Sequence, residues 1–166
     1  MFKQNDILVY GNNGICTLTD IKSEEMFGNT SLYYILTPVY DKLSTIYIPI
    51  DNNKPVSSLR HVLAKDELDK ILYEAKGKEV LWVSAAKERS EHFKKIVSKG
   101  LSVDLLCVMK SIIMQKRSFR NTSRKLTYSD TRTLEKCEKI AGEEYAFVFG
   151  VDVKDAVEHI ENELIN

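Results

Sequence analysis

The spacing of the apolar residues changes near Ser58, and this change constrains the fold more than any other feature of the sequence. Before it, short segments rich in β-branched and aromatic residues alternate with Gly and Asn turn signals, as in an antiparallel meander. After it, apolar residues recur at the spacing of amphipathic helices. A chain of 166 residues is long enough for two small cores. We therefore predict an α+β protein with two domains, residues 1–58 and 59–166.

The N-terminal part predicts a small antiparallel β-barrel. The strands that we expect cover residues 7–10, 14–18, 33–37 and 45–49. Small antiparallel sheets expose edge strands, to which a partner strand can add through main-chain hydrogen bonds. Residues 45–49 are a candidate edge strand because Pro49 lacks a backbone donor. An interior strand that the proline merely ends is the alternative.

The C-terminal part predicts an all-α domain of about five helices. Glycine after a helix and a Ser, Thr or Asp N-cap before one are the signals used. They predict helices over 67–76 and 82–98, ended by Gly77 and Gly100, and helices that begin after Ser102, Thr127 and Asp152. The helix after Ser102 carries apolar residues around most of its circumference, so we expect it in the centre of the domain.

Charge is segregated along the chain although the net charge is zero. Residues 87–125 hold 11 basic and 3 acidic side chains, whereas residues 126–166 hold 4 and 10. Local potential, more than total charge, attracts a polyanion. The basic segment is therefore a candidate DNA-binding region. The alternative is that the two segments pack together and neutralise each other.

The candidate DNA contacts fall into two groups. On the expected helix 82–98 they are Lys87, Arg89, Lys94 and Lys95, and around the next connection they are Arg117, Arg120, Arg124 and Lys125. Such residues favour largely nonspecific contacts with the DNA backbone. Trp82 has two possible roles, an apolar wedge in the minor groove or a core residue.

Signals for catalysis, metal binding or a cofactor are missing from the sequence. His61, His92 and His159 lie far apart without a second ligand at metal spacing, and no glycine-rich loop opens a helix. We predict a protein that is not an enzyme, with no metal, cofactor or small-molecule substrate. The N-terminus lacks an apolar signal core and no membrane-length apolar run occurs, so we expect a cytoplasmic location.

Several segments, in order, resemble the CarD family, whose N-terminal domain is shared with the transcription-repair coupling factor. In the first half they are residues 2–10, 13–15, Gly28, 33–36 and 46–49, and in the second half they are residues 93–100 and 126–130. The resemblance implies a Tudor- or SH3-like barrel that binds the β subunit of bacterial RNA polymerase. It also implies a helical domain at the upstream edge of the transcription bubble, where a tryptophan, here Trp82, keeps promoter DNA open.

A transcription regulator that modulates open-complex stability, located on the nucleoid through RNA polymerase, is the function that follows from this resemblance. The candidate polymerase-binding residues are Glu24, Glu25, Thr45, Ile46, Tyr47 and Pro49. The chain departs from the family in three ways. Tyr47 stands where members often have arginine, the preceding turn carries Glu24 and Glu25, and Trp82 lies nearly a helical turn farther from residues 93–96.

An adaptor on RNA polymerase is the second hypothesis. Its helical domain would bind another protein through the basic face instead of DNA. A steep salt dependence of DNA binding distinguishes the first hypothesis from the second, because released counterions scale with the phosphates that are neutralised.

Overall fold

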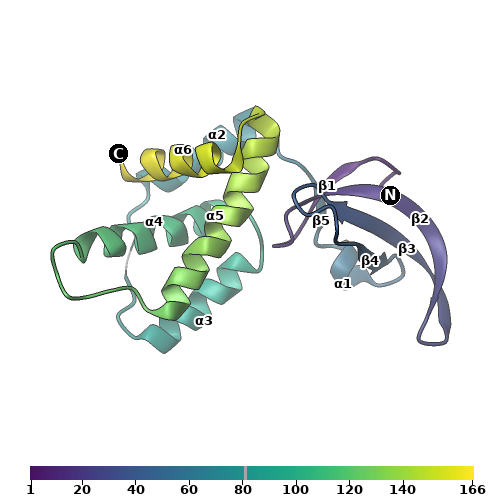
Figure 1. Cartoon of the computed structure of the whole chain (residues 1–166), viewed down its shortest axis with the longest axis horizontal. Coiled ribbons are helices and arrows are strands. Elements are labelled where there is room, and N and C mark those ends of the chain that lie inside the picture. The colour runs from purple at the N-terminus through teal and green to yellow at the C-terminus, as the bar shows by residue number, and fades with distance from the viewer. Residues whose placement is uncertain (81) are drawn as a thin grey trace. The chain divides into compact units, whose positions relative to one another are not determined.

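The computed structural model describes residues 1–80 and 82–166, which form two compact units, Met1–Val62 and Leu63–Asn166 (Figure 1). In the described residues, the strands belong to the first unit and the long helices to the second, so the α+β class is confirmed. We expected the boundary after residue 58, but it lies after Val62. The reason is that residues 59–61 pair with residues 8–10 of the first unit.

The first unit is built on a five-stranded antiparallel sheet. Its strands are β1 Ile7–Tyr10, β2 Ile15–Met26, β3 Asn29–Pro38, β4 Ile46–Pro49 and β5 Leu59–His61, in the spatial order β4-β3-β2-β1-β5. A one-turn helix, α1 Asn53–Val56, lies between β4 and β5 in the chain. Both α1 and β5 escaped prediction because segments this short carry no readable periodicity. Within the described residues the sheet is unclosed, with β4 and β5 at its edges, and closure into the expected barrel is not shown.

Paired residues on neighbouring strands build the core of the first unit. The pairs are Leu8 with Cys16, Leu18 with Leu36, and Tyr34 with Ile48. Each of these side chains is at most 2% exposed. Directly opposite residues point to the same face of a sheet, so the three pairs form one continuous apolar layer.

The hairpin between β2 and β3 extends well beyond the predicted strand 14–18. Its outer half is polar, so it lacks an apolar signal, but main-chain pairing with β3 continues to Met26 opposite Asn29. Phe27 and Gly28 form the two-residue turn, with φ angles of 53° and 79°. Glycine adopts such angles at little cost, whereas Phe27 is strained there and its side chain is fully exposed.

Over residues 63–80 and 82–166 of the second unit the structure has five helices, as predicted: α2 Lys65–Gly77, α3 Ala86–Val97, α4 Val103–Ser118, α5 Tyr128–Phe149 and α6 Val153–Ile165. The N-caps predicted for α4 and α5 are confirmed. The Leu105 N–H donates to the Ser102 hydroxyl at 3.1 Å, and the Asp130 N–H donates to the Thr127 hydroxyl at 3.1 Å. Asp152 occupies the N-cap position of α6 but makes no side-chain cap bond.

One predicted helix start and one predicted left-handed cap are wrong. The helix expected over 82–98 begins only at Ala86, because the carbonyls of Val83 and Ser84 turn to accept hydrogen bonds from the Arg89 guanidinium. Gly77 is the last residue of α2 and is not left-handed, and Lys78 caps the helix at φ −79°. Gly100 after α3 has the positive φ, 81°, that we expected of a closing glycine.

Helix α4 lies at the centre of the second unit, as its apolar circumference predicted. It contacts α2, α3, α5 and α6. Its buried apolar residues are Leu105, Leu106, Val108, Met109, Ile112 and Ile113. The other helices are amphipathic and cover it, which leaves their polar faces and the connection after α4 at the surface.

Candidate functional site

Arg89 does not lie on the surface with the lysines of α3. Its side chain is 4% exposed and forms a bidentate ion pair with Asp130, from Nε to Oδ1 at 2.9 Å and from Nη2 to Oδ2 at 2.7 Å. Burial acts to raise the pKa of Asp130, but hydrogen bonds from Arg89 and Thr127 and the charge of Arg89 outweigh it, so this pKa is lowered. The prediction that Arg89 contacts phosphates is therefore wrong, since its guanidinium is committed to the core.

Trp82 precedes α3 and is half-buried against the core of the second unit. The Arg89 guanidinium lies 4.2 Å from the centre of its ring, and Phe93 packs edge-on at 6.4 Å. The structure thus gives Trp82 the packing of a core residue on part of its surface. Its role as a DNA wedge stays a prediction.

Lys87, Lys94 and Lys95 are exposed on α3, as their predicted role requires. Lys87 and Lys94 are two turns apart and lie on the same face of the helix. Lys94 and Lys95 are in the last turn, where the helix dipole favours positive charge. These three lysines form an accessible basic surface, which we call the α3 lysines.

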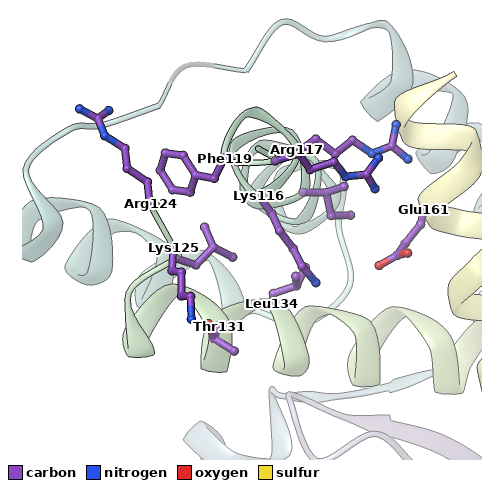
Figure 2. Close-up of a pocket in the computed structure, with 11 residues that line it drawn as sticks. Lys116, Arg117, Phe119, Arg124, Lys125, Thr131, Leu134 and Glu161 are labelled. Carbon is purple, nitrogen blue, oxygen red and sulfur yellow. The ribbon is translucent and has the colours of Figure 1, made fainter. Parts of the chain in front are cut away.

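The connection from α4 to α5 encloses a pocket of about 540 Å³. Its lining includes the second predicted group, Arg117, Arg120, Arg124 and Lys125, together with Lys116. Figure 2 shows Lys116 extending from α4 toward Leu134 of α5, Phe119 lying beside α4 on the side of Arg124, and Glu161 projecting from α6. We call this cavity the α4–α5 pocket.

A second pocket, of about 340 Å³, adjoins the first. The two share Phe119, Arg124, Lys125 and Leu126, and the second is also lined by Trp82. The fold thus brings the tryptophan to the basic connection, whereas the α3 lysines line neither pocket. Phe119 among basic residues was visible in the sequence, but its proximity to Trp82 depends on how α3 packs against α4 and α5.

Strand β4 is an edge strand, so the predicted edge at residues 45–49 is confirmed. The Ile50 N–H donates to the Leu32 carbonyl at 2.9 Å, so by antiparallel alternation Ile48 and Ile46 also bond to β3. The main chain of Tyr47 consequently points to the side of β4 away from β3. Tyr47 is 41% exposed, and its ring packs edge-on against Tyr33. Thr45, just before the strand, is exposed, and Pro49 ends it.

We predicted that Glu24 and Glu25 lie in a turn, but both lie within strand β2. They pair with Ser31 and Thr30 on the part of the hairpin that extends past β4. Glu24 forms an ion pair with Lys22 at 2.8 Å, and this hydrogen bond and charge raise the pKa of Lys22. The sheet therefore separates these glutamates along its length from Tyr47, which is aligned with Ile35 of β3.

Residues 2–62 match the family model of the CarD-like/TRCF RID domain. This range coincides with the first compact unit, Met1–Val62. The first unit is thus similar to a CarD-like/TRCF RID domain over nearly its whole length. The match confirms the family resemblance of the N-terminal part and suggests interaction of the RID domain with RNA polymerase. No curated protein matches the chain.

The helical unit lies outside the range of the RID match, so its likeness to the CarD helical domain stays a prediction. Over residues 1–80 and 82–166, the structure offers no group of three or more His, Cys, Asp or Glu side chains able to hold a metal ion. None of the helices described is both long enough and apolar enough to cross a bilayer.

Proposed function

We propose that this chain is a non-enzymatic transcription regulator that joins bacterial RNA polymerase to promoter DNA and modulates the stability of the open complex. The RID match at residues 2–62 is the observation that carries the proposal. The RID domain binds the polymerase β subunit, as the resemblance to the CarD family implies. The helical unit contacts promoter DNA at the upstream edge of the bubble.

The polymerase contact uses the free side of β4 in this proposal. The main chain of Tyr47 is directed there, and a strand of the partner can extend the sheet through it. Side chains around this edge, including the exposed Thr45 and Tyr47, then determine which strand fits. The acidic residues Glu24 and Glu25, farther along the hairpin, favour a basic neighbouring surface on the polymerase.

The DNA contact uses the α3 lysines and is largely nonspecific. Binding of the RID domain to polymerase raises the effective concentration of the helical unit beside the melted DNA, so weak phosphate contacts are sufficient. A helical unit that binds open promoter more tightly than closed promoter shifts the equilibrium by the difference in affinity. A difference of roughly 1.4 kcal/mol changes the population ratio tenfold.

The test compares open-complex lifetimes with the wild-type chain and with the triple variant Lys87→Gln, Lys94→Gln, Lys95→Gln. We expect the variant to lose its effect on lifetime and to retain polymerase binding. Lys70→Gln, Lys136→Gln, Lys154→Gln is a matched control that removes the same charge from other exposed positions. An unchanged lifetime effect in the α3 variant would overturn the proposed DNA contact.

DNA binding measured over a range of salt concentrations separates the regulator from the adaptor. DNA binding that weakens steeply with salt supports the regulator, because it reports phosphate neutralisation. Polymerase binding without any salt-sensitive DNA contact would assign the helical unit to a protein partner instead.

A further inference from the structure

Four cations that line the α4–α5 pocket have no carboxylate partner among the described residues. Arg117, Arg120, Arg124 and Lys125 are exposed, and in the part of the chain that the structure describes none of them forms an ion pair. On the neighbouring helix α5, by contrast, the exposed Arg132 pairs with Glu135 at 2.6 Å. Arginine presents a planar array of donors that matches phosphate oxygens. The pocket is therefore suited to a phosphate group.

Lys116 differs from the other four cations because it faces two carboxylates. Burial, followed by the charge and hydrogen bond of Glu161, raises the pKa of Glu138 to about 7, and the charge of Lys116 lowers it. Lys116 thus partly compensates this acidic pair from α5 and α6. The other four cations remain for a ligand.

The floor of the pocket is apolar. Ile113 and Leu134 are 7% and 5% exposed, and Phe119 and Leu126 are half-buried beside them. Ligand sites of this kind are usually roughly 300–1,000 Å³ in volume and combine an apolar lining with a few polar groups. A bare phosphate ion would leave this floor unused, whereas a ligand with a flat ring would cover it.

We propose that the α4–α5 pocket binds a nucleotide of an unpaired DNA strand, with its base against Phe119 and its phosphates on the four cations. Sites for single-stranded nucleic acid combine aromatic side chains, on which bases stack, with a basic groove that follows the backbone. The adjoining pocket offers Trp82 beside the shared residues Arg124 and Lys125, so a second base can follow the first. The inference rests on the proposed function, in which the helical unit contacts DNA, and adds that one contact is with a melted strand.

The test measures fluorescence anisotropy of the full chain with a labelled oligothymidylate of about eight nucleotides and with a labelled duplex. The pocket variant is Arg117→Gln, Arg120→Gln, Arg124→Gln, and its matched control is the α3 triple lysine variant, which loses the same charge. We expect the pocket variant to bind the single strand at least about tenfold more weakly, with a flatter salt dependence, and the α3 variant to lose mainly duplex binding.

Substitutions of Phe119 test base stacking separately from charge, because they leave the charge of the pocket unchanged. We expect Phe119→Ala to weaken single-strand binding at least about fivefold. The separate variant Phe119→Tyr should bind the single strand as the wild type does, because it keeps an aromatic ring for stacking. Thermal unfolding of each variant establishes that it is folded. Equal weakening of single-strand and duplex binding by both triple variants would overturn the pocket while leaving the proposed DNA contact intact.

Free ATP provides the second arm, since it carries the same base and phosphate chemistry. Competition by ATP only at concentrations far above those of the oligonucleotide is the expected result. ATP that binds to the wild type and not to the pocket variant, without any oligonucleotide binding, would overturn the DNA strand as the ligand. Duplex binding with no single-strand binding would overturn the pocket and not the proposed function.

Discussion

At the scale of single residues, burial gives different roles to two cations of one basic segment, Lys87 and Arg89. Lys87 stays in solvent, whereas Arg89, two positions later, is buried. A buried guanidinium needs a carboxylate and satisfied donors, because desolvation of an unpaired charge is costly. Asp130 provides the carboxylate, and the Val83 carbonyl accepts from Arg89 at 2.6 Å. The pair thus attaches α3 to the start of α5.

Removing the carboxylate of this pair is predicted to destabilise the helical unit strongly. Asp130→Asn leaves the Arg89 charge buried without compensation, so we expect a loss of about 3–5 kcal/mol in the free energy of unfolding. Urea unfolding measures this loss. Glu135→Gln, which breaks the exposed pair with Arg132, is the control and should cost at most about 0.5 kcal/mol. Equal effects of the two substitutions would contradict the assignment.

The pH dependence of stability follows from the lowered pKa of Asp130. Because the pKa is lower in the folded than in the unfolded chain, its contribution is present above the ordinary value of 3.8 and is lost as the pH falls toward the lowered value. We therefore expect the stabilities of the wild type and Asp130→Asn to begin to converge as the pH falls below about 4. Parallel curves in urea unfolding between pH 3 and 7 would show that Asp130 is not the source.

At the scale of elements, the edge position of β4 makes its main chain available. Tyr47→Pro removes the N–H that points away from β3, and proline is tolerated on the outer side of an edge strand. We expect this variant to lose polymerase binding, and Tyr47→Ala, which keeps the N–H, to retain most of it. Pull-down of the β subunit measures both. Retained binding by Tyr47→Pro, in a variant whose thermal unfolding is normal, would exclude strand addition at this edge.

The contact between α5 and α6 depends on a glycine. A Cβ at Gly142 would lie 2.5 Å from Cγ2 of Val157 and 3.3 Å from Cγ1 of Val153. Both neighbours are β-branched and have few alternative rotamers. The requirement for glycine here is therefore a matter of space between two helices and not of backbone conformation.

Gly142→Ala is predicted to destabilise the protein although alanine is the better helix former. Overpacking costs about 1–3 kcal/mol and outweighs the gain of about 1 kcal/mol in helix propensity. Gly77→Ala is the control, because Gly77 is also helical but has open space around it, and it should stabilise the protein by up to about 1 kcal/mol. Chemical unfolding of the two variants should give shifts of opposite sign, and Val157→Ala should recover part of the loss in Gly142→Ala.

At the scale of the whole molecule, the proposed function depends on two activities carried by one chain. The net charge is zero, yet the α3 lysines and the pocket cations present local positive charge. An isolated helical unit of this kind would bind DNA weakly at physiological salt. Connection to a polymerase-bound RID domain removes most of that disadvantage.

Mixing two defective variants tests this dependence. One variant is Tyr47→Pro, and the other carries the three α3 lysine substitutions. Each variant keeps the activity that the other lacks, but the two activities are on separate chains. We therefore expect the mixture to give the same open-complex lifetime as polymerase without the protein. A mixture that restores the wild-type lifetime would show that the two activities need not be linked.

Local signals in the sequence were sufficient for much of this description. The strand at 7–10, the edge character of residues 45–49, the caps Ser102 and Thr127 and the central place of α4 were all predicted correctly. Each depends on residues within a few positions of one another, where periodicity, proline and capping chemistry act directly. The match of the RID domain likewise follows from the order of its segments.

The tertiary structure alone decided the character of the candidate site. Arg89 and Asp130 are 41 positions apart, and their pairing turned a predicted phosphate contact into a core residue. Trp82 and Phe119, which line one pocket, are likewise far apart in sequence. Such contacts depend on how helices pack around α4, and the charge or periodicity of one segment contains no information about which distant segment will lie against it.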